Sequence, residues 1–267
     1  MPKSTAKEIK ITRAVAAKVL KVVDAGLSNG LGKPKPGEMC VEAAVCYALG
    51  LPHGDNPACV APALRSLKIA LNDKAWSSPV ARAKGMRRLA IIQLGTAGEL
   101  DEKAFVAAVA EMTIRTFIPI ALRAAASVKG NAAHKDKLEA AADRCEKEGT
   151  KDAAYDAANA AAYAAANDAN AAAYDAAYAA NAAYAAAYDA AYAAANAANA
   201  AYAAANAAAY AAAYAAYATA NAAAYAAYAA YAAKNRDGIL AQFAEAVVQI
   251  LIRMGVKASK YLDLAPL

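Results

Sequence analysis

A tract built almost entirely from one amino acid limits what this chain can fold into. From Ala153 to Ala233 the sequence contains only alanine, tyrosine, asparagine and aspartate, with one threonine at position 219. Alanine is the strongest helix former, because its side chain loses no rotamer entropy on folding. Polyalanine can also stack as β-sheet, as it does in silks, so the spacing of the other residues has to decide between helix and sheet.

The spacing favours a helix. Between Asp152 and Asn235 a residue other than alanine recurs every three or four positions. The mean step is about 3.6 residues, the period of the α-helix, whereas a strand has a period of two. A heptad repeat would supercoil to the left and an eleven-residue repeat to the right. A repeat of about 18 residues in five turns predicts instead one straight helix over 150–236, about 130 Å long at about 1.5 Å per residue.

Such a helix would have two unlike faces, one of alanine methyl groups and one carrying rings and amides. Tyrosine suits an interface because its ring buries a large area and its hydroxyl tolerates water. Small residues let helix backbones approach closely. We interpret the two faces as self-association surfaces, rather than as a solvated spacer, which would carry more Glu and Lys. The predicted tyrosine stripe is Tyr155, Tyr163, Tyr174, Tyr178, Tyr184, Tyr188, Tyr192, Tyr202, Tyr210, Tyr214, Tyr217, Tyr225, Tyr228 and Tyr231.

Both ends of the tract carry helix-end signals. Gly149 is suited to stop the preceding helix and Thr150 to cap the new one, with Asp152 in its first turn. At the other end Lys234 and Arg236 are placed where cations stabilise a helix C-terminus, and Gly238 follows as a stop.

Residues 1–149 predict a small all-α head. Apolar residues recur at helical spacing, and turn-forming residues separate the segments. Pro79 takes a permitted first-turn position after Ser77 and Ser78, and Pro119 predicts a kink in a long helix. No segment alternates as a strand would. The expected helices cover residues 9–27, 39–49, 61–71, 77–94, 101–127 and 131–148.

Residues 237–267 form a third part, an amphipathic C-terminal helix. Its apolar face includes Phe243, Val247, Ile250 and Leu251. At the far end of a straight rod this face could not reach its own head, so we expect another chain to cover it, in an antiparallel dimer or a filament. A bend in the tract would instead let the C-terminal helix pack on the head of its own chain, but bends without Gly or Pro are uncommon.

The charge of the chain is uneven. Residues 1–150 carry 23 Lys and Arg against 15 Asp and Glu, and residues 151–267 carry 6 against 8. A basic head could bind nucleic acid or another anionic partner, and Arg82, Lys84, Arg87 and Arg88 form the candidate patch. An ordinary solvated basic surface gives the same count.

No chemistry-bearing motif stands out. Cys40, Cys46, Cys59 and Cys145 lack metal-binding or disulfide spacing, although adding His53 and His134 would allow a zinc site in principle. We expect buried structural thiols, no metal, no cofactor and no catalytic residues. The charged N-terminal segment is not a signal peptide, and no run of residues reaches the length and apolarity of a membrane span. We therefore expect a cytoplasmic, non-enzymatic protein.

Three functions remain open. The first is a structural protein that self-assembles through the tract into a homo-oligomer. The second rests on a resemblance: the alanine-rich tract, with Asn and Asp at regular spacing, resembles the helical type I antifreeze proteins, which implies ice binding. That family's threonines at eleven-residue spacing are absent, and only Thr219 is present. The third is a nucleic-acid-binding head on an oligomerising stalk.

Overall fold

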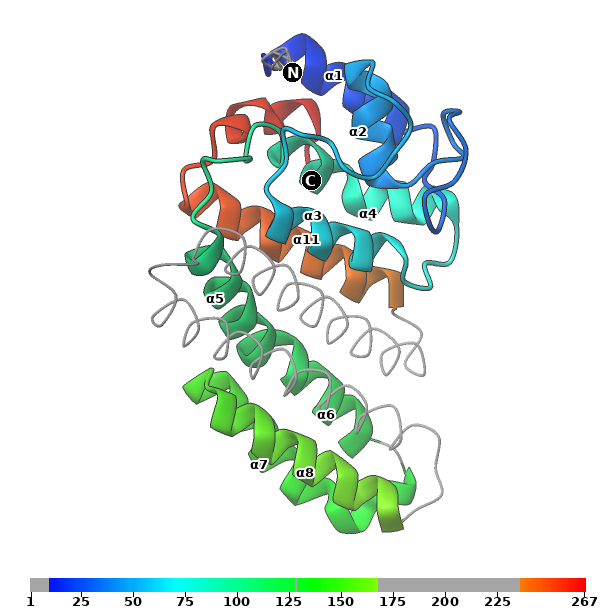
Figure 1. Cartoon of the computed structure of the whole chain (residues 1–267). Helices are drawn as coiled ribbons and strands as arrows, with labels where there is room; N and C mark the ends of the chain where they lie inside the picture. The colour runs from blue at the N-terminus through cyan, green and yellow to red at the C-terminus, as the bar shows by residue number, and fades with distance from the viewer. Residues whose placement is uncertain (1–9, 128, 168–235) are drawn as a thin grey trace, which may run out of the picture.

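The computed structural model describes residues 10–127, 129–167 and 236–267, and within these residues the chain is mainly helical. The nine α-helices of this described part are arranged as a head and a lower layer (Figure 1). Among the described residues, the only β-type contact is an isolated bridge between Gly32 and Met39. The all-α class predicted from the sequence is therefore confirmed for the described residues.

The helices of the head lie close to the predicted positions. Most of them are separated by turns that contain Gly, Pro, Ser or Asp. In chain order the elements are α1 (Arg13–Val23), α2 (Val41–Leu49), α3 (Pro62–Asn72), α4 (Pro79–Ile92), α5 (Glu102–Met112), α6 (Ile118–Ala126), α7 (Lys135–Glu148), α8 (Lys151–Asn167), α11 (Arg236–Arg253) and a final 3-10 segment, η3 (Lys257–Leu264).

Capping residues explain why several helices begin and end where they do. The Ser78 hydroxyl accepts a hydrogen bond from the backbone N–H of Ala81, and Pro79 occupies the first turn of α4, as predicted. Gly50 ends α2 with a φ of 69°, a left-handed conformation that glycine adopts without a Cβ penalty.

The helices α5 and α6 form one continuous element from Glu102 to Ala126, joined by a π-helical segment at Thr113–Phe117 (η1). Pro119 lies two residues after this segment, in the first turn of α6. Proline has no N–H to donate to the carbonyl four residues earlier, and a π-turn absorbs the irregularity just before it. By length and composition this helix could cross a membrane, which was not predicted from the sequence, but most of its apolar window is buried inside the protein.

The larger of two hydrophobic clusters, here called the head core, is built mainly from α1 to α5, α11 and η3, and also contains Phe117 and Ala121. It contains bulky side chains such as Leu64, Met86, Phe105 and Leu251, all fully buried. Segments far apart in sequence meet here, because α11 lies along α4 and contacts α5 (Figure 1).

The position of α11 overturns the expectation that another chain covers the tail. Phe243, Val247, Ile250 and Leu251 are all buried in the chain's own head. The Phe243 ring meets Phe117 edge to face, with 5.1 Å between the ring centroids. The expectation failed because it assumed a distance of about 130 Å between the two ends of the tract. The described ends, α8 and α11, instead both pack on the same folded body.

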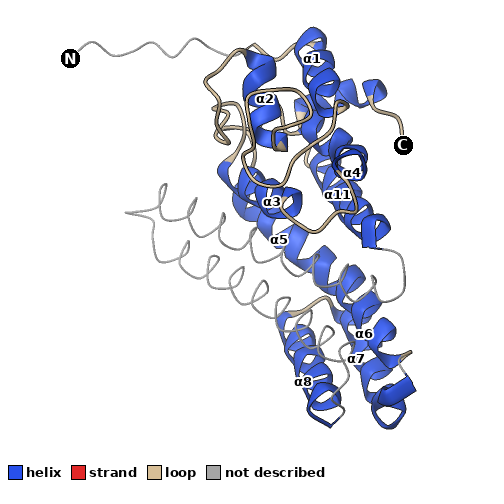
Figure 2. Cartoon of the chain, turned by 90° about the vertical axis from the view of Figure 1, so that its right-hand side faces the viewer, coloured by secondary structure: helices blue, strands red, loops and turns tan. Residues whose placement is uncertain are grey.

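The second cluster, here called the alanine layer, lies between α6, α7 and α8. Figure 2 shows α8 beside α7 below the head. Nine of its fourteen buried residues are alanines. The larger members are Ile114, Ile118, Leu122 and Leu138, with Cys145.

The predicted straight helix over 150–236 is described only at its start. That start is α8, while 168–235 lie outside the described residues. The start was predicted correctly: Gly149 ends α7 with a φ of 64°, and the Thr150 hydroxyl accepts from the N–H of Ala153. At the other end, Gly238 lies within α11 (Arg236–Arg253).

Candidate functional site

The two faces of α8 have different surroundings. Its buried residues, Ala153, Ala154, Ala157, Ala158 and Ala161, follow the spacing of one helix face. Asp152, Tyr155, Asp156 and Asn159 are exposed, and Tyr155 retains 49% of its accessible surface. In this first part of the tract the alanine face is therefore the buried packing face, and the polar residues lie on the exposed side of the helix.

The acceptor for the alanine face is the surface formed by α6 and α7. Ile118, Leu122, Leu138 and Cys145 are buried there beneath α8. Alanine side chains carry only a methyl group, so the helix backbones approach closely and no large side chain has to find a pocket. The contact is therefore defined by the shape of the helices more than by individual anchors.

Arginine side chains reinforce this thin apolar contact. Arg144 of α7 forms ion pairs with Glu148 and with Asp156 of α8. Its hydrogen bond lowers the pKa of the Glu148 carboxyl below the usual value. Arg123 of α6 pairs with three carboxylates of α7, those of Glu139, Asp143 and Glu146.

Arg115, in the π-helical segment, fixes the junction where the tract begins. Its guanidinium donates to the backbone carbonyls of Glu146, Lys147 and Glu148 at 2.7–2.9 Å. These carbonyls belong to the last turn of α7, which has no further helical N–H to bind and carries a partial negative charge. A Cβ on Gly149 would stand 2.5 Å from the Arg115 Nε, so glycine is required there for space as well as for backbone conformation.

Cys145 lies at the centre of the alanine layer with no accessible surface. Its thiol donates to the Ala153 carbonyl, with Sγ 3.4 Å from the oxygen. Burial raises the pKa of this thiol to about 12. The other three cysteines are also buried and free, as expected from the sequence. No group of His, Cys, Asp or Glu that could hold a metal ion is found among the described residues.

The predicted anion patch is not one surface. Arg82 is buried and donates to the Asn72 and Leu27 carbonyls at 2.7 and 2.8 Å. Arg87 pairs with Asp24, and Arg88 pairs with Glu245. Three of the four cations thus hold elements of the head together. Lys84 is exposed, and no ion pair of its side chain is found in the described part of the chain.

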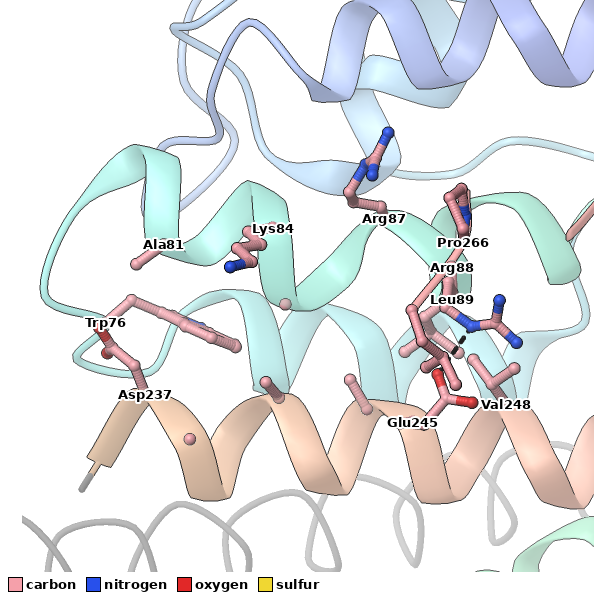
Figure 3. A pocket seen from close by; sticks show the side chains of 15 residues that line it. Trp76, Ala81, Lys84, Arg87, Arg88, Leu89, Asp237, Glu245, Val248 and Pro266 are labelled. Carbon is pink, nitrogen blue, oxygen red and sulfur yellow. Dashed lines mark hydrogen bonds and ion pairs between the residues drawn. The ribbon is translucent and has the colours of Figure 1, made fainter. Parts of the chain in front are cut away.

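A groove with a volume of about 500 Å³ lies between α4 and α11 (Figure 3). Its floor is apolar, with Leu89 and Val248, and Trp76 lies at one end. Gly85 makes room for the indole, since a Cβ there would stand 2.3 Å from a ring carbon. At the rim Arg88 binds Glu245 at 2.8 Å, whereas Arg87 points away from α11. The groove brings together no nucleophile and base from the described residues.

A buried ion pair in the head core was not predicted from the sequence. The Lys68 ammonium lies 2.9 Å from a Glu42 carboxylate oxygen, and both side chains are completely inaccessible. Burial raises the pKa of Glu42 and lowers that of Lys68, since it penalises both charges. The second carboxylate oxygen of Glu42 has no hydrogen-bond partner among the described residues. The sequence does contain an indication of this ion pair, because Lys68 interrupts the apolar stripe of Leu64, Leu67 and Leu71 on α3.

Only the start of the predicted tyrosine stripe can be placed. Tyr155 lies on the exposed face of α8, in agreement with its place in the stripe. Tyr163 belongs to α8, and its side chain is not described. The twelve tyrosines from Tyr174 to Tyr231 lie outside the described residues.

Fold and site together define an all-α protein with an alanine-rich helix docked against its own head. No known protein family, curated protein or solved structure matches this chain.

Proposed function

We propose that this protein is a non-enzymatic assembly protein whose alanine-rich tract forms the contact surface between chains. The observation that carries the proposal is the docking of α8. There the tract buries its alanine methyl groups against helices, Asp156 pairs with Arg144, and Tyr155 and Asn159 stay exposed. The same composition and period continue through residues 168–235.

The tract is the part of the chain best suited to association. The C-terminal helix α11 cannot provide a contact between chains, because its apolar face is already buried in its own head. Both faces of the tract have suitable chemistry: the methyl face allows close backbone approach, and tyrosine rings contribute large contact areas at a small cost in side-chain entropy. The proposed product is a homo-oligomer built by lateral contacts between tracts.

The two other functions draw less support. Ice binding would require an accessible alanine face, and on α8 that face is covered by α6 and α7. Nucleic-acid binding would require a cluster of available cations, and Arg82, Arg87 and Arg88 are engaged within the head. No observation on the described residues favours either function.

Two deletions within the tract test the proposal. Removing the segment from Tyr192 to Ala209 takes out five whole turns and keeps the faces in register. Removing only the segment from Tyr192 to Ala207 rotates one half of the stripe by about 160° relative to the other. Sedimentation velocity should show that the first variant associates like the full chain and the second associates less. Equal association of the two variants, or a monomeric full chain at every concentration, would contradict the proposal.

A further inference from the structure

The segment of α8 that docks on the head is repeated in the tract. Residues 153–161 read Ala-Ala-Tyr-Asp-Ala-Ala-Asn-Ala-Ala. Residues 172–180 and 186–194 both read Ala-Ala-Tyr-Asp-Ala-Ala-Tyr-Ala-Ala. The tract thus contains three copies of one nine-residue unit, here called the Tyr-Asp unit, of which the first lies in the described part of the chain.

The docked copy shows which positions of the unit matter for binding. Positions 1, 2, 5, 6 and 9 of the unit are the alanines buried against α6 and α7. Position 4 is Asp156, which pairs with Arg144. All of these residues are identical in the other two copies. The copies differ only at position 7, where Asn159 is exposed on α8 and tyrosine stands in the others. Within 153–161, the buried alanines and the aspartate that pairs with Arg144 are therefore present three times in the chain.

The chain has one acceptor surface for these three units. The first unit occupies it with a strong advantage, because only Gly149 and Thr150 separate α7 from α8 and the effective concentration is high. A unit from a second chain would bury the same alanines and meet the same arginine. Replacing the first unit by a unit of a second chain therefore changes the contacts with α6 and α7 little. The remaining free-energy cost is that of bringing two chains together.

We propose that the α6–α7 surface is a docking site for the Tyr-Asp units at 172–180 and 186–194 of a second copy of this chain. The proposal rests on the self-association proposed above and gives it an acceptor and a donor. Each chain offers one acceptor and two further donors, so exchange of α8 links chains into an assembly. Arg144 selects the units, because aspartate stands at position 4 of each.

A matched pair of double variants of the full chain separates the two faces of the units. Ala176→Asp with Ala190→Asp places a carboxylate at position 5, which is buried in the docked copy. Tyr174→Asp with Tyr188→Asp places the same charges at position 3, which is exposed in it. Burying an unpaired charge is costly, so the alanine variant should self-associate at least about tenfold more weakly than the full chain in sedimentation velocity. The tyrosine variant leaves the docked face intact and should therefore associate more strongly than the alanine variant.

A peptide locates the acceptor directly and does not depend on the chain's own association. A peptide of residues 169–183 with a diazirine side chain at position 179, the counterpart of the partly buried Ala160, is irradiated with the full-length protein, and the cross-linked residues are identified by mass spectrometry. Cross-links are expected on residues 114–126 and 138–145. The same peptide with Ala176→Asp should lose them.

The outcomes distinguish this inference from the proposed function. Loss of association in the tyrosine variant and not in the alanine variant would overturn the docking inference and leave self-assembly standing. Cross-links confined to other parts of the head, or equal for both peptides, would also overturn it. If the full chain is monomeric at every concentration, self-assembly fails, and the peptide cross-links alone support or overturn the acceptor.

Discussion

The head core and the alanine layer share the helix from Glu102 to Ala126 but are built from different side chains. In the head core large residues such as Leu64 and Phe105 are fully buried, and each such residue contributes about 1.5–3 kcal/mol. In the alanine layer nine of fourteen buried residues are alanines, each of which removes from water little more than one methyl group, about 0.8 kcal/mol.

The difference shows how a thin apolar contact is supplemented. Around the alanine layer the arginines at positions 115, 123 and 144 bind carboxylates and helix-end carbonyls. These groups are partly exposed, and such pairs contribute about 0–1 kcal/mol each. We therefore expect α8 to leave its site at a lower free energy than the head core needs to unfold.

The largest effect is expected from a charge in the head core. Phe243→Asp removes the contact with Phe117 and buries a carboxylate, so the free energy of unfolding should fall by at least about 3–5 kcal/mol. Urea unfolding measures the loss, and Gln242→Asp, at the exposed neighbouring position, is the control. The oligomeric state of the Phe243→Asp variant should stay unchanged under conditions in which its head remains folded. A folded head with unchanged stability would show that α11 does not belong to its core.

A smaller effect is expected from overpacking in the alanine layer. Ala157→Leu inserts three carbon atoms where α8 lies on α6 and α7, at a cost of about 1–3 kcal/mol. The cost should appear as faster alkylation of Cys145, with little change in the unfolding of the head. Asn159→Leu adds a leucine on the exposed face and should leave the rate unchanged. Equal rates for both variants would mean that the buried face of α8 is assigned wrongly.

A pair of glycine variants isolates the Arg115 contact. Gly149→Ala and Gly50→Ala both force alanine into the left-handed region, at about 1–2 kcal/mol. Only at Gly149 does the new Cβ meet another group, the Arg115 side chain, whereas nothing lies within 4 Å at Gly50. Gly149→Ala should therefore cost about 1 kcal/mol more than Gly50→Ala, measured by thermal unfolding. Equal losses of stability in the two variants would show that the Arg115 contact does not stabilise the junction between α7 and α8.

The smallest effect concerns pH. Burial raises the pKa of Cys145 from its usual value near 9 to about 12, so the folded state keeps a proton that the unfolded state loses. The stability that this provides is complete below pH 9 and falls as the pH rises toward 12, by up to about 1 kcal/mol between pH 8 and pH 9.5. Urea titrations at the two pH values measure the fall, and Cys145→Ala should reduce it. A fall of the same size in Cys145→Ala would assign it to other groups.

Local features of the fold could be predicted from the sequence. Apolar spacing gave the helices of the head, and Ser78, Gly149 and Thr150 marked helix ends because caps act within a few residues. The expectation that the tail lies far from its own head extrapolated a local period over the whole tract and took no account of contacts between distant segments. For the same reason the partners of Arg82, Arg87 and Arg88 were missed, since no pattern along α4 indicates that Leu27, Asp24 and Glu245 lie beside them.

The connection of α8 and α11 to one folded body has a consequence for how such chains vary. The tract is an insertion between two packed elements, and not an appendage at one end. The entropic cost of closing a loop between two packed elements grows slowly with its length, by about 0.6 kcal/mol for each doubling. A change in the number of Tyr-Asp units should therefore alter the stability of the head little. Under the docking inference each added unit would raise the valence of the chain by one.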